Sequence, residues 1–110
     1  MLQAHPDIEL IYTSNEGACV GAFNGLREAG KINEVKLVGF DSSAAMKEGI
    51  ASGEIIGAIT QDPVGMGYKT VEAAVKLLKG EEVESFIDTG CYWYDADNME
   101  EDHIAPLLYD

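Results

Sequence analysis

Three polar residues stand at equivalent places in the chain, each after an apolar run and before a helical pattern. They are Asn15, Asp41 and Gln61, and the apolar runs before them cover residues 10–13, 35–40 and 55–60. The carboxyl ends of parallel strands meet at one edge of an α/β sheet, where open sheets of this class bind their ligands. The sequence therefore predicts a ligand site formed by these three side chains.

The chemical types of these side chains suit hydroxyl groups. The Asp41 carboxylate can accept hydrogen bonds from two neighbouring hydroxyls of a polyol, and its charge strengthens them. It can equally cap the turn that follows. Asn15 can donate to and accept from a hydroxyl, although it is also a natural helix N-cap. Gln61 is the most informative, because glutamine is a poor cap and Asp62 already stands at the capping position. A ligand is the simplest reason for an amide there.

Catalytic, cofactor and metal sites are not predicted. His5 and His103 lie away from the strand ends, which argues against a Ser–His–Asp arrangement, and neither has the spacing of a zinc ligand. No glycine-rich nucleotide motif follows a strand. A phosphoacceptor receiver domain would carry a lysine at a later strand end, where this chain has Gln61. We therefore expect no enzyme activity and no cofactor.

The composition is that of one small domain with a core. The chain has 110 residues, 46% of them hydrophobic, and a formal net charge of -13. That charge argues against nucleic acid and anionic membranes as partners. The start of the sequence lacks the basic and apolar regions of a signal peptide, and no apolar run approaches the ~20 residues of a membrane span. Cys19 lies in a helical pattern and is expected to pack in the core, and a disulfide with Cys91 is not favoured.

Strand and helix patterns alternate along the chain, which predicts a parallel sheet with right-handed crossovers. The expected strands are residues 8–13, 35–40, 55–60 and about 86–94; the expected helices are 16–29, 44–52 and 63–79, with the end of a helix at 1–4 and a short helix at 100–108. The predicted N-caps are Asn15, Ser42 or Ser43, and Asp62, and the predicted stops are Gly30, Gly53 and Gly80.

Two features of these elements concern packing. Val64, Tyr68, Val71, Val75 and Leu78 make one apolar face of the third helix, while Gly17, Gly21 and Gly25 recur every four residues on the first and would let a neighbouring backbone approach. The aromatic run Tyr92, Trp93 and Tyr94 could stack on a sugar face. Packing in a core or an interface is the favoured interpretation of this run.

The ordered motifs TSNEGACVGAFNGLREAGK, VKLVGFDSS and IASGEIIGAITQDPVGMGYKTVEAAVKLLKGEEV resemble the C-terminal part of type I periplasmic solute-binding proteins, in particular the ribose-binding-like sugar receptors of ABC importers. The resemblance covers nearly the whole chain. It implies a Rossmann-like parallel sheet with helices on both faces. It also implies that Asn15, Asp41 and Gln61 bind sugar hydroxyls, the same three residues that the strand pattern selects.

The resemblance further implies a fragment of a two-lobed, extracytoplasmic receptor, periplasmic or lipid-anchored, that delivers a monosaccharide to a membrane permease. Residues 1–85 would belong to the C-terminal lobe, and residues 86–110 to a hinge crossover strand and tail. The lobe's first strand, which would pair with residues 10–13, is not in the sequence. An unpaired apolar edge invites another chain, so we expect a homodimer or a swapped assembly.

An alternative with the same fold is the effector-binding core of a lactose-repressor-family transcription regulator. Such chains often carry VGYDD where this sequence has VGFDS at residues 38–42. A helix-turn-helix upstream would favour the regulator, and a secretion or lipoprotein signal would favour the receptor.

Overall fold

A computed structural model describes residues 2–110. The elements are β1 (Leu10–Tyr12), α1 (Glu16–Glu28), β2 (Lys36–Phe40), α2 (Ala44–Ala51), β3 (Gly57–Gln61), α3 (Pro63–Leu78), β4 (Cys91–Tyr94) and the short 3-10 helix η1 (Ala105–Leu107). The strands form a sheet in the order β1-β2-β3-β4. β1, β2 and β3 are parallel, and β4 is antiparallel to β3. The predicted α/β class is confirmed.

One face of the sheet carries the core. α1 contacts β2 and α2, and it contributes Cys19, Phe23 and Leu26, which are buried against Met46 and Ile50 of α2. Cys19 therefore packs in the core, as expected. Gly39 of β2 permits the close approach of both helices, since a Cβ there would lie 2.7 Å from the Met46 methyl and 2.8 Å from the Cys19 sulfur.

The helix ends follow the predicted signals. The side chains of Asn15, Ser43 and Asp62 accept hydrogen bonds from backbone amides in the first turns of α1, α2 and α3. Gly30, Gly53 and Gly80 follow these helices with positive φ angles of 66°, 78° and 76°. Glycine adopts this left-handed conformation without a steric penalty, so it ends a helix cleanly.

Several element boundaries differ from the prediction. The strands expected over 8–13 and 86–94 are shorter, Leu10–Tyr12 and Cys91–Tyr94. The helix expected over 100–108 is a set of turns that leads into η1, where Pro106 has no amide to donate to a longer helix. Residues 2–4 form a turn rather than the end of a helix. Met1 lies outside the described residues.

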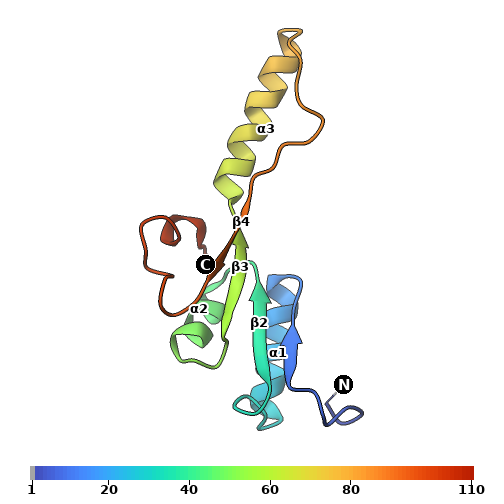
Figure 1. Cartoon of the computed structure of the whole chain (residues 1–110), viewed down its shortest axis with the longest axis vertical. Helices are drawn as coiled ribbons and strands as arrows, with labels where there is room; N and C mark the ends of the chain where they lie inside the picture. Colours follow the sequence, from blue (N-terminus) through green and yellow to red (C-terminus); the bar gives the residue numbers. More distant parts are fainter. Residues whose placement is uncertain (1) are drawn as a thin grey trace.

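α3 leaves the sheet instead of covering it. It continues beyond the carboxyl end of β3, and residues 79–90 return beside it to β4 (Figure 1). No residue of α3 is buried. The apolar face expected to pack is exposed: the fractions are 73% for Val64, 72% for Tyr68, 64% for Val71, 43% for Val75 and 88% for Leu78. Within residues 2–110, helices thus cover one face of the sheet. We call residues 63–90, which comprise α3 and the returning segment, the arm.

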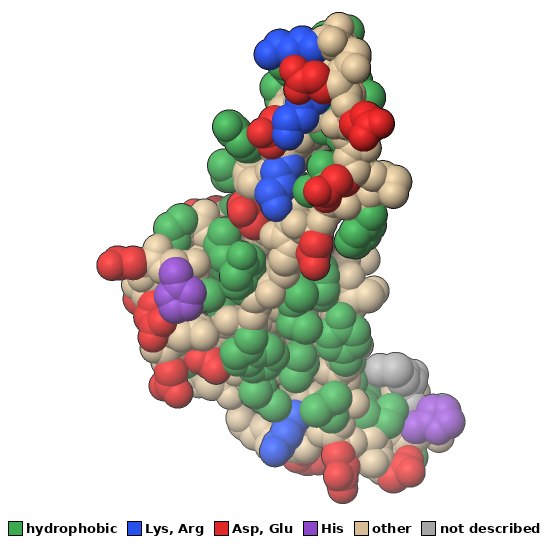
Figure 2. Space-filling model, turned by 45° about the horizontal axis from the view of Figure 1, so that its top comes forward, with side chains coloured by type: hydrophobic (Ala, Val, Ile, Leu, Met, Phe, Trp, Pro, Cys, Tyr) green, Lys and Arg blue, Asp and Glu red, His purple; other side chains and the backbone are tan. Residues whose placement is uncertain are grey.

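The second face of the sheet is also open in the described chain. Leu10 and Tyr12 are each 53% exposed, and Trp93 is 41% exposed. Figure 2 shows hydrophobic side chains gathered over the body of the molecule, and charged side chains lining one side of the arm. Two apolar surfaces, one on the sheet and one on α3, therefore lack a covering layer here.

The glycine spacing in α1 has a different meaning from the one expected. A Cβ at Gly21 or Gly25 would meet nothing within 4 Å, so no backbone packs against them. The close approach is instead at Gly57 in β3, where the Trp93 ring lies on the strand and a Cβ would sit 2.6 Å from the Tyr94 carbonyl oxygen.

We predict opposite effects of alanine at two of these glycines. Gly57→Ala must displace β4, because the clashing carbonyl is backbone, and should lower the free energy of unfolding by about 1–3 kcal/mol. Gly21→Ala is the matched control: in an open helix position it should raise stability by up to about 1 kcal/mol. Urea unfolding midpoints measure both. Equal midpoints for the two variants would contradict the packing of β4 on Gly57.

Candidate functional site

The three predicted site residues lie at the carboxyl ends of the three parallel strands. Asn15 follows β1, Asp41 follows β2, and Gln61 ends β3. The strands are in register at this edge, since the Thr13 amide donates to the Val38 carbonyl at 3.0 Å and the Asp41 amide donates to the Ile59 carbonyl at 2.8 Å. The structure therefore brings all three to one edge of the sheet.

Asn15 is the N-cap of α1. Its Oδ1 accepts a hydrogen bond from the Ala18 amide at 2.8 Å, which uses one lone pair of the amide oxygen. The Asn15 side chain is exposed, and its NH₂ group has two donors. Capping and ligand binding are therefore compatible for this residue, with the NH₂ group available to a ligand oxygen.

Asp41 has an unusual backbone and an open carboxylate. Its φ angle is +71°, the one positive value at a non-glycine residue among residues 2–110. The Oδ2 atom accepts from the Glu16 amide at 3.3 Å, so the carboxylate lies against the first turn of α1, beside Asn15. A helix N-terminus favours a negative charge at this position. The capping interaction expected of Asp41 is thus made to the neighbouring helix and not to the turn that follows Asp41.

Gln61 lies at the opposite side of Asp41 from Asn15. It is half-buried at the end of β3, and its register partner is Cys91 of β4. Asp62 caps α3 through a hydrogen bond from the Gly65 amide at 2.8 Å, so the capping position is filled without Gln61. The side-chain amide of Gln61 is therefore not required for the helix end.

The aromatic run on β4 divides between the two faces of the sheet. Tyr94 is fully buried in the core, which confirms the packing interpretation for this residue. Trp93 lies on the opposite face over Gly57, and its Nε1 donates to the Asp95 carboxylate at 2.7 Å. That bond holds the pKa of Asp95 below its usual range.

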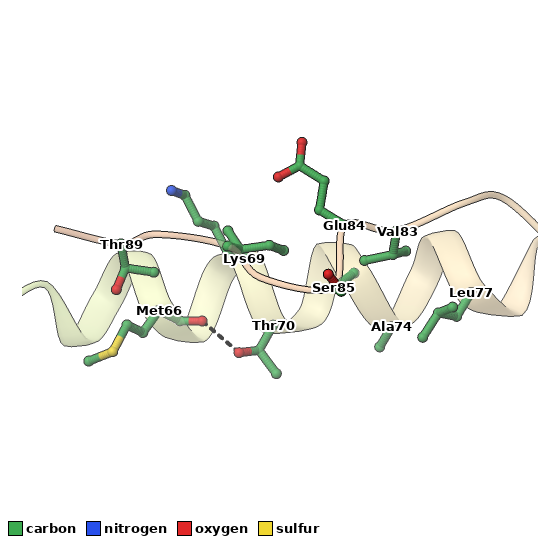
Figure 3. Close-up of a pocket in the computed structure, with 11 residues that line it drawn as sticks. Met66, Lys69, Thr70, Ala74, Leu77, Val83, Glu84, Ser85 and Thr89 are labelled. Atoms are coloured by element: carbon green, nitrogen blue, oxygen red, sulfur yellow. Dashed lines mark hydrogen bonds between the residues drawn. The ribbon is translucent and has the colours of Figure 1, made fainter.

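A second candidate is a groove along the arm (Figure 3). It has a volume of about 520 Å³ and is lined by Met66, Thr70, Ala74 and Leu77 of α3 together with residues of the returning segment, among them Val83. The Thr70 hydroxyl is already bonded to the Met66 carbonyl at 2.7 Å. Few polar groups converge there, so the groove resembles an uncovered packing surface more than a built polyol site. Among the described residues, no cluster of His, Cys, Asp or Glu is placed to hold a metal ion.

The sequence did not reveal two contributors to the strand edge. The Tyr94 hydroxyl donates to the Asp41 carbonyl at 2.8 Å, and the Ser42 hydroxyl donates to the Tyr109 carbonyl at 3.0 Å. Burial raises the pKa of Tyr109, and the nearby charge of Asp41 raises it further. These contacts join residues 53 and 67 positions apart, and no local pattern could have identified them.

Comparisons with known proteins agree with this geometry. The profile of the periplasmic binding protein domain matches residues 1–82. The ribose import binding protein of Escherichia coli (strain K12) is 38% identical over 85 residues, which are 77% of this chain and 28% of that protein. The chain thus spans a little over a quarter of that relative's length.

Solved structures show the same arrangement of elements. An ABC transporter solute binding protein from Agrobacterium vitis with bound D-fucose aligns with a TM-score of 0.90 at 31% identity, covering 98% of this chain and 37% of that one. A carbohydrate transporter solute binding protein from Agrobacterium radiobacter in complex with D-arabinose aligns with a TM-score of 0.89 at 33% identity, covering the same shares. These relatives are substrate-binding transport proteins. The chain belongs to the periplasmic binding protein family.

Proposed function

We propose that this chain is part of the solute-binding component of an ABC sugar importer and that it binds a monosaccharide or related polyol without chemistry. The observation that carries the proposal is the convergence of Asn15, Asp41 and Gln61 at the carboxyl ends of β1, β2 and β3. A charged acceptor flanked by two amides matches a row of ring hydroxyls. The ribose, D-fucose and D-arabinose of the relatives present such rows.

The first test is a titration of the chain with D-ribose, D-arabinose and D-fucose, followed by amide NMR shifts. A site that contacts only one side of a sugar should bind it weakly, with a dissociation constant of about 1 mM, which corresponds to a binding free energy of about 4 kcal/mol. The expected shifts cluster at Asn15, Asp41 and Gln61. Shifts confined to the arm groove would contradict the proposed site.

A chimera tests the same site within a longer binding protein. The matched 85-residue segment of the Escherichia coli ribose import binding protein is replaced by the corresponding part of this chain. We expect the folded chimera to bind D-ribose and to bind it much more weakly when Asp41 is replaced by asparagine. A folded chimera that binds ribose equally well with and without Asp41 would refute the role of this carboxylate.

The proposal includes the setting of the whole protein. We propose that it acts outside the cytoplasm, in the periplasm or anchored to the cell surface, and that its macromolecular partner is a membrane permease and not nucleic acid. The chain has 20 acidic and 7 basic residues, and this surplus of negative charge argues against nucleic acid as a partner. Among the described helices, none has the length and apolar character needed to cross a membrane.

The regulator alternative has less support. The relatives described above are named as import or ABC transporter binding proteins, and no feature of residues 2–110 favours an effector-binding core over a transport receptor. The division of the chain into 1–85 and 86–110 stays a prediction. In the structure β4 returns to the same sheet as β3, while the arm lies outside it.

We also propose that the chain self-associates, as a homodimer or a swapped assembly. The exposed apolar residues Tyr68 and Val71 on α3, and Leu10 and Tyr12 on the edge strand β1, support this proposal, because large uncovered apolar patches mark interfaces. Light scattering on a sizing column should give twice the chain mass at a protein concentration of about 10 µM, which is enough to populate a dimer with a dissociation constant of about 1 µM. Tyr68→Lys with Val71→Lys should shift it to the monomer. A wild-type monomer under these conditions would contradict association.

A further inference from the structure

Asp41 holds a conformation that its own side chain does not favour. A φ angle of +71° places Cβ close to the following carbonyl, which disfavours every residue except glycine, with aspartate and asparagine less affected than most. Such a residue keeps this conformation only where its surroundings fix it. The carboxylate direction depends on this angle, so the groups that hold the Asp41 backbone also aim its side chain.

Both backbone polar groups of Asp41 are held from the neighbouring strands. Its amide donates to the Ile59 carbonyl of β3 at 2.8 Å. Its carbonyl accepts from the Tyr94 hydroxyl of β4 at 2.8 Å. Tyr94 is fully buried, and its Cα pairs with that of Ala58 in the sheet. The strand pairing therefore fixes the backbone position from which the phenol extends. A buried phenol needs a hydrogen-bond partner, and the Asp41 carbonyl provides it.

The C-terminal tail holds the next residue and the adjacent strand. The Ser42 hydroxyl donates to the Tyr109 carbonyl at 3.0 Å, and the Thr60 hydroxyl lies 3.4 Å from the Leu107 carbonyl. Ser42 and Thr60 are both fully buried. Lys47 of α2 forms an ion pair with Asp110 at the end of the chain. The tail thus lies against the turn that carries Asp41.

We propose that Tyr94 is a positioning residue for Asp41: its hydroxyl, together with the tail bonded to Ser42, holds Asp41 in the left-handed conformation that directs the carboxylate toward α1 and the strand edge. This inference rests on the proposed sugar-binding role of Asp41. It makes the affinity of the site depend on β4 and the tail, which are distant from it in sequence.

Tyr94→Phe tests the proposal, since it removes one hydroxyl and keeps the ring. A residue with positive φ gives a strong cross-peak between its own amide and α protons, and this peak at Asp41 is the first measurement. We expect it to weaken in Tyr94→Phe and in a second variant, Ser42→Ala. Tyr92→Phe, the same change two residues away on β4, should leave it unchanged. A role limited to stability would lower the unfolding midpoint and leave the Asp41 peak intact, and that result would overturn the proposal.

Titration with D-ribose gives the second measurement. In Tyr94→Phe the dissociation constant should rise about three- to tenfold, as for the loss of one hydrogen bond, with no change in Tyr92→Phe. Unchanged affinity in a Tyr94→Phe protein whose Asp41 peak has weakened would overturn the link between this geometry and binding. If the wild-type chain itself binds no ribose, the proposed function fails, while the Asp41 peak still decides whether Tyr94 positions this residue.

Discussion

Replacing Asp41 by asparagine is expected to weaken the binding of D-ribose about 30- to 150-fold. Hydrogen bonds to a charged acceptor contribute about 1.5–3 kcal/mol, against about 0.5–1.5 kcal/mol for neutral pairs. The difference is about 1–1.5 kcal/mol per bond, so two such bonds to vicinal hydroxyls lose about 2–3 kcal/mol when the charge is removed, and each 1.4 kcal/mol is tenfold in affinity. In an NMR titration at about 10 mM sugar, a rise of the dissociation constant from ~1 mM to about 30 mM or more should reduce the ribose-dependent shifts at Asn15 and Gln61 to less than about a third of their wild-type size.

The choice of asparagine follows from the backbone at this position. Asp41 has a φ angle of +71°, which asparagine tolerates and alanine does not. Asp41→Ala would combine the loss of the carboxylate with about 1 kcal/mol or more of backbone strain. Asp41→Gly relieves that strain while removing the carboxylate, so it should fold at least as well as the wild type and still bind no sugar.

A matched control for the charge is available in the tail. Asp102→Asn makes the same change at an exposed aspartate away from the strand ends. It should leave the ribose titration unchanged. If Asp41→Asn and Asp102→Asn bind ribose equally well, Asp41 is a structural residue of the turn and not a ligand group.

The parts of the fold that the sequence predicted are those set by local chemistry. The caps Asn15, Ser43 and Asp62 and the stops Gly30 and Gly53 stand where the pattern placed them, because each acts on backbone groups within one turn. The order of strands and helices could be predicted for the same reason, because it too depends on local patterns in the sequence. From that order alone, parallel topology brings the three polar residues to one edge.

The position of α3 could not be predicted in this way. Its apolar face, which includes Tyr68 and Val71, has the helical period of a packed helix, but the period does not specify which surface covers it. In the structure that face is exposed, and α3 extends past the sheet (Figure 1). Sequence pattern establishes that such a helix needs a partner surface, while the direction of the chain after Asp62 depends on tertiary structure.

Local sequence patterns also could not predict the internal geometry of the site. The positive φ of Asp41 has no signature in a GFDSS motif, and the support from Tyr94 and Tyr109 crosses 53 and 67 residues. A glycine inside a strand gives no side chain to a packing pattern, yet Gly57 is the position on which Trp93 lies. In each case the missing information is which distant segment lies beside the strand.

Alkaline pH is expected to destabilise the fold through Tyr94. Burial raises the pKa of its phenol to about 12, against an ordinary value of 10.0. Below pH 10 the phenol is neutral in the folded and unfolded chains, and its full contribution is present. Between about pH 10 and 12 the unfolded chain releases the proton while the folded chain retains it, so stability falls. Two pKa units at 1.36 kcal/mol each give a loss of about 3 kcal/mol.

Tyr94→Phe isolates this contribution. Burial also raises the pKa of Cys19, and that of Tyr109 is raised in the same direction, so the wild-type curve alone cannot assign the loss. At pH 8 the phenylalanine variant should be less stable by about 1 kcal/mol, the contribution of the hydrogen bond to the Asp41 carbonyl. As the pH rises past 10 its unfolding free energy should decline less steeply, and the two proteins should become equal before pH 12. Parallel urea-unfolding curves at every pH would show that the Tyr94 phenol ionises as freely in the folded chain as in the unfolded one, and so is not held in the core by its bond to Asp41.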